Sequence, residues 1–109
     1  MTSYELKDNL NTFNTSIDDK ISSYSSILSS MTQITNDINS VKGADSAMYD
    51  GVLQNNEIVT KSLNKIIKEL ESLKSSVNAK TNDEISRLKK QEDDAKKEKE
   101  EEEEGEDDE

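Results

Sequence analysis

The residue types that carry most enzyme and metal chemistry are absent from this sequence or stand in the wrong context. There is no histidine and no cysteine, so the commonest general base is missing and neither disulfides nor thiolate metal sites can form. Serines are plentiful, but none lies in a nucleophile-elbow sequence, and the glycines at 43, 51 and 105 are isolated instead of forming a phosphate-binding loop. We therefore expect a protein that is not an enzyme and uses no cofactor.

Two groups of carboxylates remain as candidate cation ligands. Asp18 and Asp19 are adjacent on a predicted helix, where a solvated pair is expected and no metal site. Residues 92–109 carry 13 acidic residues against three lysines, which is −10 of the total net charge of −11. This run could attract divalent cations weakly, but it lacks the ordered loop of a calcium site. Residues 1–91 are nearly neutral and offer no basic surface for nucleic acid.

Two long apolar stripes define the elements that must carry any function. Within each stripe, successive residues are three or four positions apart, a spacing that places them on one face of a helix. The first stripe is Leu6, Leu10, Phe13, Ile17, Ile21, Tyr24, Leu28, Met31, Ile34, Ile38 and Val41. The second is Met48, Val52, Val59, Leu63, Ile66, Leu70, Leu73 and Val77. Each half of the chain is therefore predicted to form one long amphipathic helix.

The segment between the stripes predicts a turn. Gly43 can adopt the left-handed conformation that ends a helix, and Asp45 is a candidate N-cap for the next one. We expect an all-α protein in which residues 1–80 form an antiparallel helix-turn-helix hairpin. Its first helix spans about 4–41, its turn 42–45 and its second helix about 46–78. Residues 81–91 are expected to be a fraying helical extension, and 92–109 a disordered acidic tail or at most a solvated helix.

The apolar stripes are wider than a two-helix contact can cover. Four apolar residues lie beside the predicted seam, the line along which the two helices contact each other: Ile27, Leu53, Ile58 and Ile67. We therefore expect docking against a second pair of helices, as in a four-helix bundle. The alternative is that the four are ordinary exposed side chains. Phe13 and Tyr49 are either seam residues or anchors for a partner. The predicted partner-binding face is Phe13, Ile27, Met31, Tyr49, Leu53, Ile58, Ile66 and Ile67.

Asn55 and Asn56 interrupt the second stripe with polar side chains. Either the seam drifts at this point, or a buried asparagine there fixes the register and the choice of partner at a cost in stability. Both interpretations are open at the level of sequence.

Composition limits the setting in which the protein works. With 29% apolar and 36% charged residues, no stretch approaches the roughly 20 apolar residues of a membrane span. The N-terminus lacks the basic start and apolar run of a secretory signal peptide. We expect a cytoplasmic protein, or one exported without a cleaved signal.

The arrangement of the predicted hairpin resembles the WXG-type proteins of type VII secretion. That family has a Trp-x-Gly tripeptide at the turn, then small and aromatic residues, and a leucine-rich second helix. Here Val41 and Gly43 occupy the turn, Ala47 and Tyr49 follow it, and Leu63, Ile66, Leu70 and Leu73 are similar to the second-helix pattern. The resemblance covers about residues 4–80 and implies a helical hairpin that pairs with another helical protein.

Departures from the family pattern point to one of its subgroups. Val41 replaces the tryptophan, and the family's export signal, an aromatic residue followed four positions later by an acid, is missing after the second helix. Tyr4 and Asp8 have that spacing at the other end of the hairpin, and Leu88 and Glu92 have it with leucine in place of the aromatic. These features are most similar to the small helical partner proteins of LXG-type toxins, which are thought to present an export signal jointly with the toxin.

Three functions follow as expectations. The first is a targeting chaperone that binds the N-terminal helical domain of an LXG-type toxin or a second small hairpin. The second is a self-assembling homodimeric helical protein. The third is an acidic-tailed chaperone of a basic partner, in which residues 92–109 do the binding.

Overall fold

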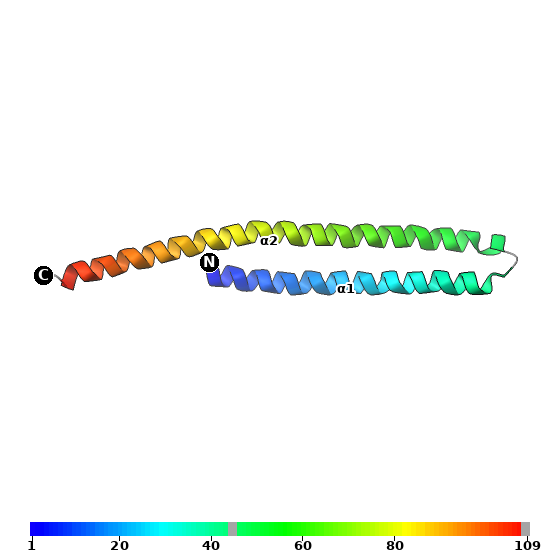
Figure 1. Ribbon diagram of the computed structural model, residues 1–109, viewed down its shortest axis with the longest axis horizontal. Coiled ribbons are helices and arrows are strands. Elements are labelled where there is room, and N and C mark those ends of the chain that lie inside the picture. Colours follow the sequence, from blue (N-terminus) through cyan, green and yellow to red (C-terminus); the bar gives the residue numbers. More distant parts are fainter. Residues whose placement is uncertain (44–45, 108–109) are drawn as a thin grey trace. The chain divides into compact units, whose positions relative to one another are not determined.

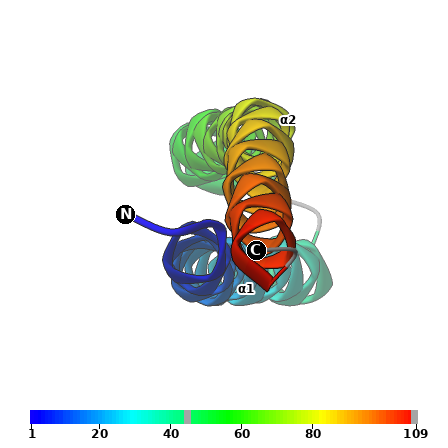
Figure 2. The same ribbon diagram turned by 90° about the vertical axis from the view of Figure 1, so that its left-hand side faces the viewer.

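The fold is an all-α helical hairpin in the computed structural model, which describes the backbone of residues 1–43 and 46–107. Helix α1 spans Ser3–Val41, a 3₁₀ helix η1 spans Ser46–Tyr49 and helix α2 spans Asp50–Asp107. The chain divides into two compact units. We call residues 15–74 the turn half, and residues 1–14 together with 75–109 the terminal half. In the turn half, the cyan coil of α1 lies beside the green coil of α2 in both views (Figures 1 and 2).

Local signals at the ends of α1 explain where it starts and stops. The Thr2 hydroxyl accepts a hydrogen bond of 3.1 Å from the Glu5 amide, which satisfies a donor of the first turn. At the other end Gly43 has φ 55°, the left-handed conformation that terminates many helices. Gly43, which the sequence placed in the turn, thus follows the end of α1, and Val41 is the last residue of that helix. Asp45, the expected N-cap, lies outside the described residues. Gly51 lies in the first turn of α2.

Several of the serines and threonines of α1 are accommodated by bonds to the helix's own backbone. Hydroxyls of Thr12, Ser23 and Thr32 donate to the carbonyl oxygens four residues earlier, at 3.0 to 3.2 Å. Such bonds satisfy the hydroxyls without help from a second helix, although these residues are mediocre helix formers. The long polar face of α1 is therefore compatible with a continuous helix of 39 residues.

The seam of the turn half coincides with the predicted stripe at most positions of α1 but departs from the second predicted stripe at several positions. Before the turn, its buried or half-buried positions are Ile17, Ile21, Tyr24, Leu28, Met31, Thr35 and Ile38 of α1 and Lys42 just after that helix. After the turn, they are Tyr49 of η1 and Leu53, Asn56, Thr60, Leu63, Ile67, Leu70 and Lys74 of α2, with Ile66 half-buried beside them. The predicted seam was wrong at Ile34, Val41, Met48, Val52, Val59 and Leu73, which are exposed. A two-helix contact buries only two positions in seven, so a stripe three residues wide cannot be buried whole.

Polar side chains complete the seam of the turn half. Asn56 is only 6% exposed, and its amide nitrogen on α2 donates to the Met31 carbonyl oxygen of α1 at 2.9 Å and also to the Thr35 hydroxyl. Lys74 contacts Asp18 at 2.7 Å across the same seam. Asn56 is therefore the buried asparagine that the sequence left open, while Asn55 is exposed.

The terminal half is held by a smaller core and two polar contacts. Leu10 is buried, and Asn14 and Asn78 exchange amide hydrogen bonds of 2.7 and 2.9 Å. Glu92 accepts two hydrogen bonds at the start of α1, from the Ser3 amide at 2.8 Å and from the Ser3 hydroxyl at 2.5 Å. A carboxylate is well placed there because the first amides of a helix lack intrahelical partners.

The predicted end of the second helix near Asn78 was wrong, because α2 continues without a break to Asp107. The extension 81–91 is not frayed, and Ile85 and Leu88 are half-buried. Residues 92–107 are helical instead of disordered, and side chains 93–102 are exposed, as in the solvated helix that the sequence also allowed. Glu, Lys and Ala favour helix, and Lys96 and Lys97 have acids four residues before and after them.

The contact between Glu92 and Ser3 makes the start of α1 sensitive to acid. The two hydrogen bonds from Ser3 lower the pKa of Glu92 below its ordinary value of 4.5. Because the pKa is depressed in the folded state, the contact's contribution is present at neutral pH and is lost as the pH falls from about that ordinary value through the folded pKa. We expect Glu92→Gln to speed amide exchange of Glu5 and Leu6 at pH 7, whereas the exposed Asp94→Asn does not. A wild-type and Glu92→Gln difference that persists unchanged down to the lowest pH at which the helices remain folded would contradict this role.

Candidate helix-docking surface

A series of apolar side chains at heptad spacing lies directly beside the seam of the turn half. We assign the seam residues to heptad positions a and d. Each residue of the series comes directly before a seam residue at position a and therefore occupies position g. They are Ile27, Ile34 and Val41 on α1, and Val52, Val59, Ile66 and Leu73 on α2. We call these seven residues the apolar face. Six of them are 42% to 70% exposed, and Ile66 is half-buried.

The two parts of the apolar face lie on the same side of the hairpin. Antiparallel neighbours are related by a two-fold axis perpendicular to their common plane, so equivalent heptad positions on the two helices fall on the same side. The register set by the contact between Thr35 and Asn56 brings Ile34 roughly level with Val59. The same register pairs Ile27 with Ile66 and Val41 with Val52. The face therefore consists of three apolar pairs seven residues apart, extended on α2 by Leu73.

The surroundings of the apolar face are small and mostly uncharged. The neighbouring exposed position c holds Ser23, Ser30 and Asp37 on α1, and Asn55, Ser62 and Glu69 on α2. On α1 the heptad series continues to Lys20, where an exposed lysine replaces the apolar residue. Short side chains allow a second helix to approach closely, and the face ends within the turn half.

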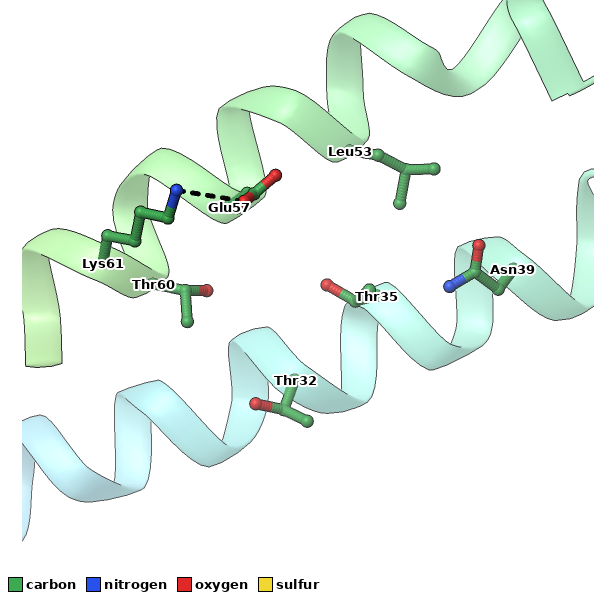
Figure 3. A pocket seen from close by; sticks show the side chains of 7 residues that line it. All are labelled: Thr32, Thr35, Asn39, Leu53, Glu57, Thr60 and Lys61. Atoms are coloured by element: carbon green, nitrogen blue, oxygen red, sulfur yellow. Dashed lines mark ion pairs between the residues drawn. The ribbon is translucent and has the colours of Figure 1, made fainter.

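The opposite side of the turn half is polar and contains a shallow groove of about 480 Å³. Thr32, Thr35 and Asn39 of α1 line it together with Leu53, Glu57, Thr60 and Lys61 of α2 (Figure 3). Lys61 and Glu57 form an ion pair of 3.1 Å along α2, drawn as a dashed line in Figure 3. Thr32, Asn39 and Glu57 all occupy position e, which confirms that equivalent positions share one side. The groove combines hydroxyls and one exposed ion pair with Leu53 and the methyl groups of its threonines, and no isoleucine or valine lines it.

The eight residues of the predicted partner-binding face are distributed over four environments. Four of them are half-buried in the seam of the turn half: Met31, Tyr49, Leu53 and Ile67. Phe13 is half-buried in the terminal half. Ile27 and Ile66 belong to the apolar face. Ile58 is 61% exposed one position before Val59 and is the outermost of the set. The sequence did not single out Ile34, Val41, Val52, Val59 or Leu73 for a partner, because their spacing had assigned them to the seam.

The residues of the candidate export motif all belong to the terminal half. Tyr4 is 78% exposed, Asp8 is exposed, and Leu88 is half-buried. Glu92 bonds Ser3, the residue before Tyr4, so the two spaced pairs meet at the start of α1. Their role in export stays a prediction.

Other ligand chemistry has little support in the described part of the chain. No group of three or more aspartate or glutamate side chains there is placed to hold a metal ion, and Asp18 instead pairs with Lys74. No helix over the described ranges is long and apolar enough to cross a membrane. The feature with a clear physical use is the apolar face.

Comparison of the chain with known protein families, with curated proteins and with solved structures found no match. The class that the fold itself defines is an all-α helical hairpin, and its function must be argued from the surface of that hairpin.

Proposed function

We propose that this protein is a non-enzymatic helical partner protein that binds the helical domain of a type VII secretion substrate, an LXG-type toxin, and serves as its targeting chaperone. The observation that carries the proposal is the apolar face, which leaves apolar side chains exposed over three heptads on one side of the hairpin. A pair of helices from another protein, laid on this face, would complete a four-helix bundle. The toxin as partner rests on the sequence resemblance.

The energetics favour such a role over that of a self-sufficient domain. Leu10, Ile17 and Leu63 are the buried apolar residues among those described, and none of the three is completely enclosed. Burying a valine, leucine or isoleucine side chain contributes about 1.5 to 3 kcal/mol. Covering the apolar face would therefore add to the buried apolar surface of the hairpin and to its stability. A partner that binds only the folded hairpin also raises its stability by mass action.

The terminal half supports the targeting part of the proposal. Exposed Tyr4 and Asp8 lie on α1, and Glu92 bonds the start of that helix. In this arrangement both halves of the candidate motif can be presented at one place. We propose that the protein is either retained in the cytoplasm as a chaperone or exported with the toxin.

The test is co-expression of the full chain with the N-terminal helical domain of an LXG-type toxin encoded beside its gene. We expect co-purification in equal amounts and a melting temperature that rises with the concentration of the toxin domain. Ile27→Glu, on the apolar face, should abolish co-purification, whereas Ser29→Glu, on the opposite side of the same helix turn, should not. Binding that survives Ile27→Glu would exclude the apolar face as the site.

A second candidate function is supported by the exposed acidic helix after Glu92. Ten successive exposed residues, 93–102, include Lys96, Lys97 and Lys99 but are mainly acidic, and such a helix can attract a basic protein. Deleting residues 93–109 removes this helix and retains the Ser3 contact of Glu92. If the hairpin is the binding element, the deletion leaves toxin binding unchanged at about 0.15 M salt, where screening is strong beyond roughly 8 Å. Loss of binding on deletion, at low and at physiological salt, would favour the acidic helix.

A further inference from the structure

We propose that the groove on the polar side of the turn half binds an arginine side chain of another protein. The residues that carry the proposal are Thr32 and Thr35 of α1 and Leu53, Glu57 and Thr60 of α2. The groove lies on the other side of the hairpin from the apolar face. The inference therefore goes beyond the proposed function and does not rest on it.

The threonine hydroxyls of the groove can accept further hydrogen bonds but have no proton left to donate. The hydroxyls of Thr32, Thr35 and Thr60 donate to the carbonyl oxygens four residues earlier on their own helices, at 2.8 to 3.1 Å. A hydroxyl has one proton and two lone pairs, so each oxygen remains an acceptor. Asn56 uses one lone pair of Thr35. The hydroxyls of Thr35 and Thr60 point toward the space between the two helices (Figure 3), which favours an occupant rich in donors.

Glu57 supplies the negative charge of the groove. Its Oε1 atom contacts the ammonium of Lys61 at 3.1 Å, and no ion pair with another described residue engages its Oε2 atom. Both side chains of this ion pair are exposed, and an exposed pair contributes little, so Lys61 can turn toward water when another cation binds the carboxylate. A cationic donor in the groove would gain both an ion pair and hydrogen bonds.

A guanidinium matches these acceptors better than an ammonium does. It carries five N–H donors in a planar fork, so one group can bond the carboxylate of α2 and hydroxyl oxygens of both helices. An ammonium has three donors and is more strongly hydrated. The methylene stem of an arginine can lie on Leu53 and on the threonine methyl groups. The groove volume of about 480 Å³ is ample for this side chain.

The occupant is expected from another protein, because the chain's own arginine is already paired. Arg87 is the single arginine of the sequence, and its guanidinium forms an ion pair with Glu84 on the same helix. The net charge of −11 also attracts a cationic partner. An arginine in the groove leaves the apolar face free, so the hairpin could hold a different partner segment on each side.

The test is a nuclear magnetic resonance titration of the full chain at low salt, with N-acetyl-arginine methylamide as the probe. We expect the amide signals of Thr32, Thr35 and Thr60 to shift and to saturate. The dissociation constant should be roughly 1 to 10 mM, as is usual for so small a ligand. N-acetyl-lysine methylamide should bind at least about threefold more weakly. Equal binding of the two probes would overturn the assignment of a guanidinium.

Three variants separate the groove from a general attraction of cations to an acidic protein. Glu57→Gln should weaken binding of the arginine probe at least about fivefold. Glu71→Gln makes the same change two heptads further along the same side of α2, and it should leave binding within about twofold of the wild type. Thr32→Val should weaken binding at least about threefold, because it removes an acceptor without changing any charge.

Circular dichroism should show wild-type helicity in all three variants, because Thr32, Glu57 and Glu71 are exposed. Shifts that do not saturate, or equal weakening by Glu57→Gln and Glu71→Gln, would overturn the groove as a binding site. Unchanged binding by Thr32→Val would overturn the role of the hydroxyls. Each of these results would leave the toxin-binding proposal standing, because that proposal depends on the apolar face.

Discussion

Replacing Leu63 with aspartate is expected to unfold the turn half of the hairpin. Leu63 is 7% exposed in the seam, and a carboxylate at this position would be removed from water without a cation or a donor arranged to pair with it. Burial of an unpaired charge, together with the loss of the leucine's packing, costs on the order of 4 kcal/mol or more. That is comparable to the whole stability of a small domain. The expected result is loss of most of the helical circular dichroism signal at 25 °C.

Asn64→Asp is the matched control for Leu63→Asp. It introduces the same aspartate one residue further along α2, at a position that is exposed, and it should change the free energy of unfolding by less than about 0.5 kcal/mol. Equal losses of helicity in the two variants would show that α2 does not bury the Leu63 side of its surface.

The sequence predicts the number of helices and the position of the turn because these depend on local chemistry. Apolar residues three and four apart specify amphipathic helix wherever they occur, and Gly43 takes the positive φ that a helix end requires. Neither feature depends on which residues of the other helix lie opposite. The all-α hairpin is therefore readable from the chain alone.

The residues that form the seam cannot be predicted in the same way, because on each helix two adjacent rows of residues could face the other helix. Ile34 and Thr35 are adjacent, and hydrophobicity alone favours Ile34. The structure buries Thr35, whose hydroxyl donates to the Met31 carbonyl at 3.1 Å and accepts from Asn56. A threonine satisfied by its own helix can be buried at small cost. The choice thus depends on a contact with a residue 21 positions away.

The apolar face was misassigned for the same reason. Val52 and Val59 fit the helical spacing of the second stripe, but α2 turns Leu53 and Thr60 into the seam instead. A signal was present in the sequence, since Ile27, Ile34 and Val41 recur every seven residues, as do Val52, Val59, Ile66 and Leu73. When apolar residues recur every seven positions directly beside the seam residues, the apolar stripe is three heptad positions wide. A hairpin buries only two of these positions.

The end of α2 was misplaced because composition was given more weight than spacing. A high charge with little to bury is typical of disorder, yet alternating lysines and acids four residues apart support a solvated helix. The contact between Ser3 and Glu92 could not be predicted, because it joins residues 89 positions apart.

Thiol labelling of two isoleucine-to-cysteine variants tests the central claim that Ile34 is outside the seam and Ile38 is inside it. The chain has no cysteine of its own, so each variant carries a single thiol, and the two positions are one helical turn apart on α1. At a concentration low enough for the monomer, we expect Ile34→Cys to react at least about 10-fold faster than Ile38→Cys, whose half-buried thiol is reached mainly when the seam opens. With a bound partner, labelling of Ile34→Cys should slow while that of Ile38→Cys changes little. Equal rates in the dilute monomer, or faster labelling of Ile38→Cys, would place Ile34 in the seam and contradict the exposed apolar face.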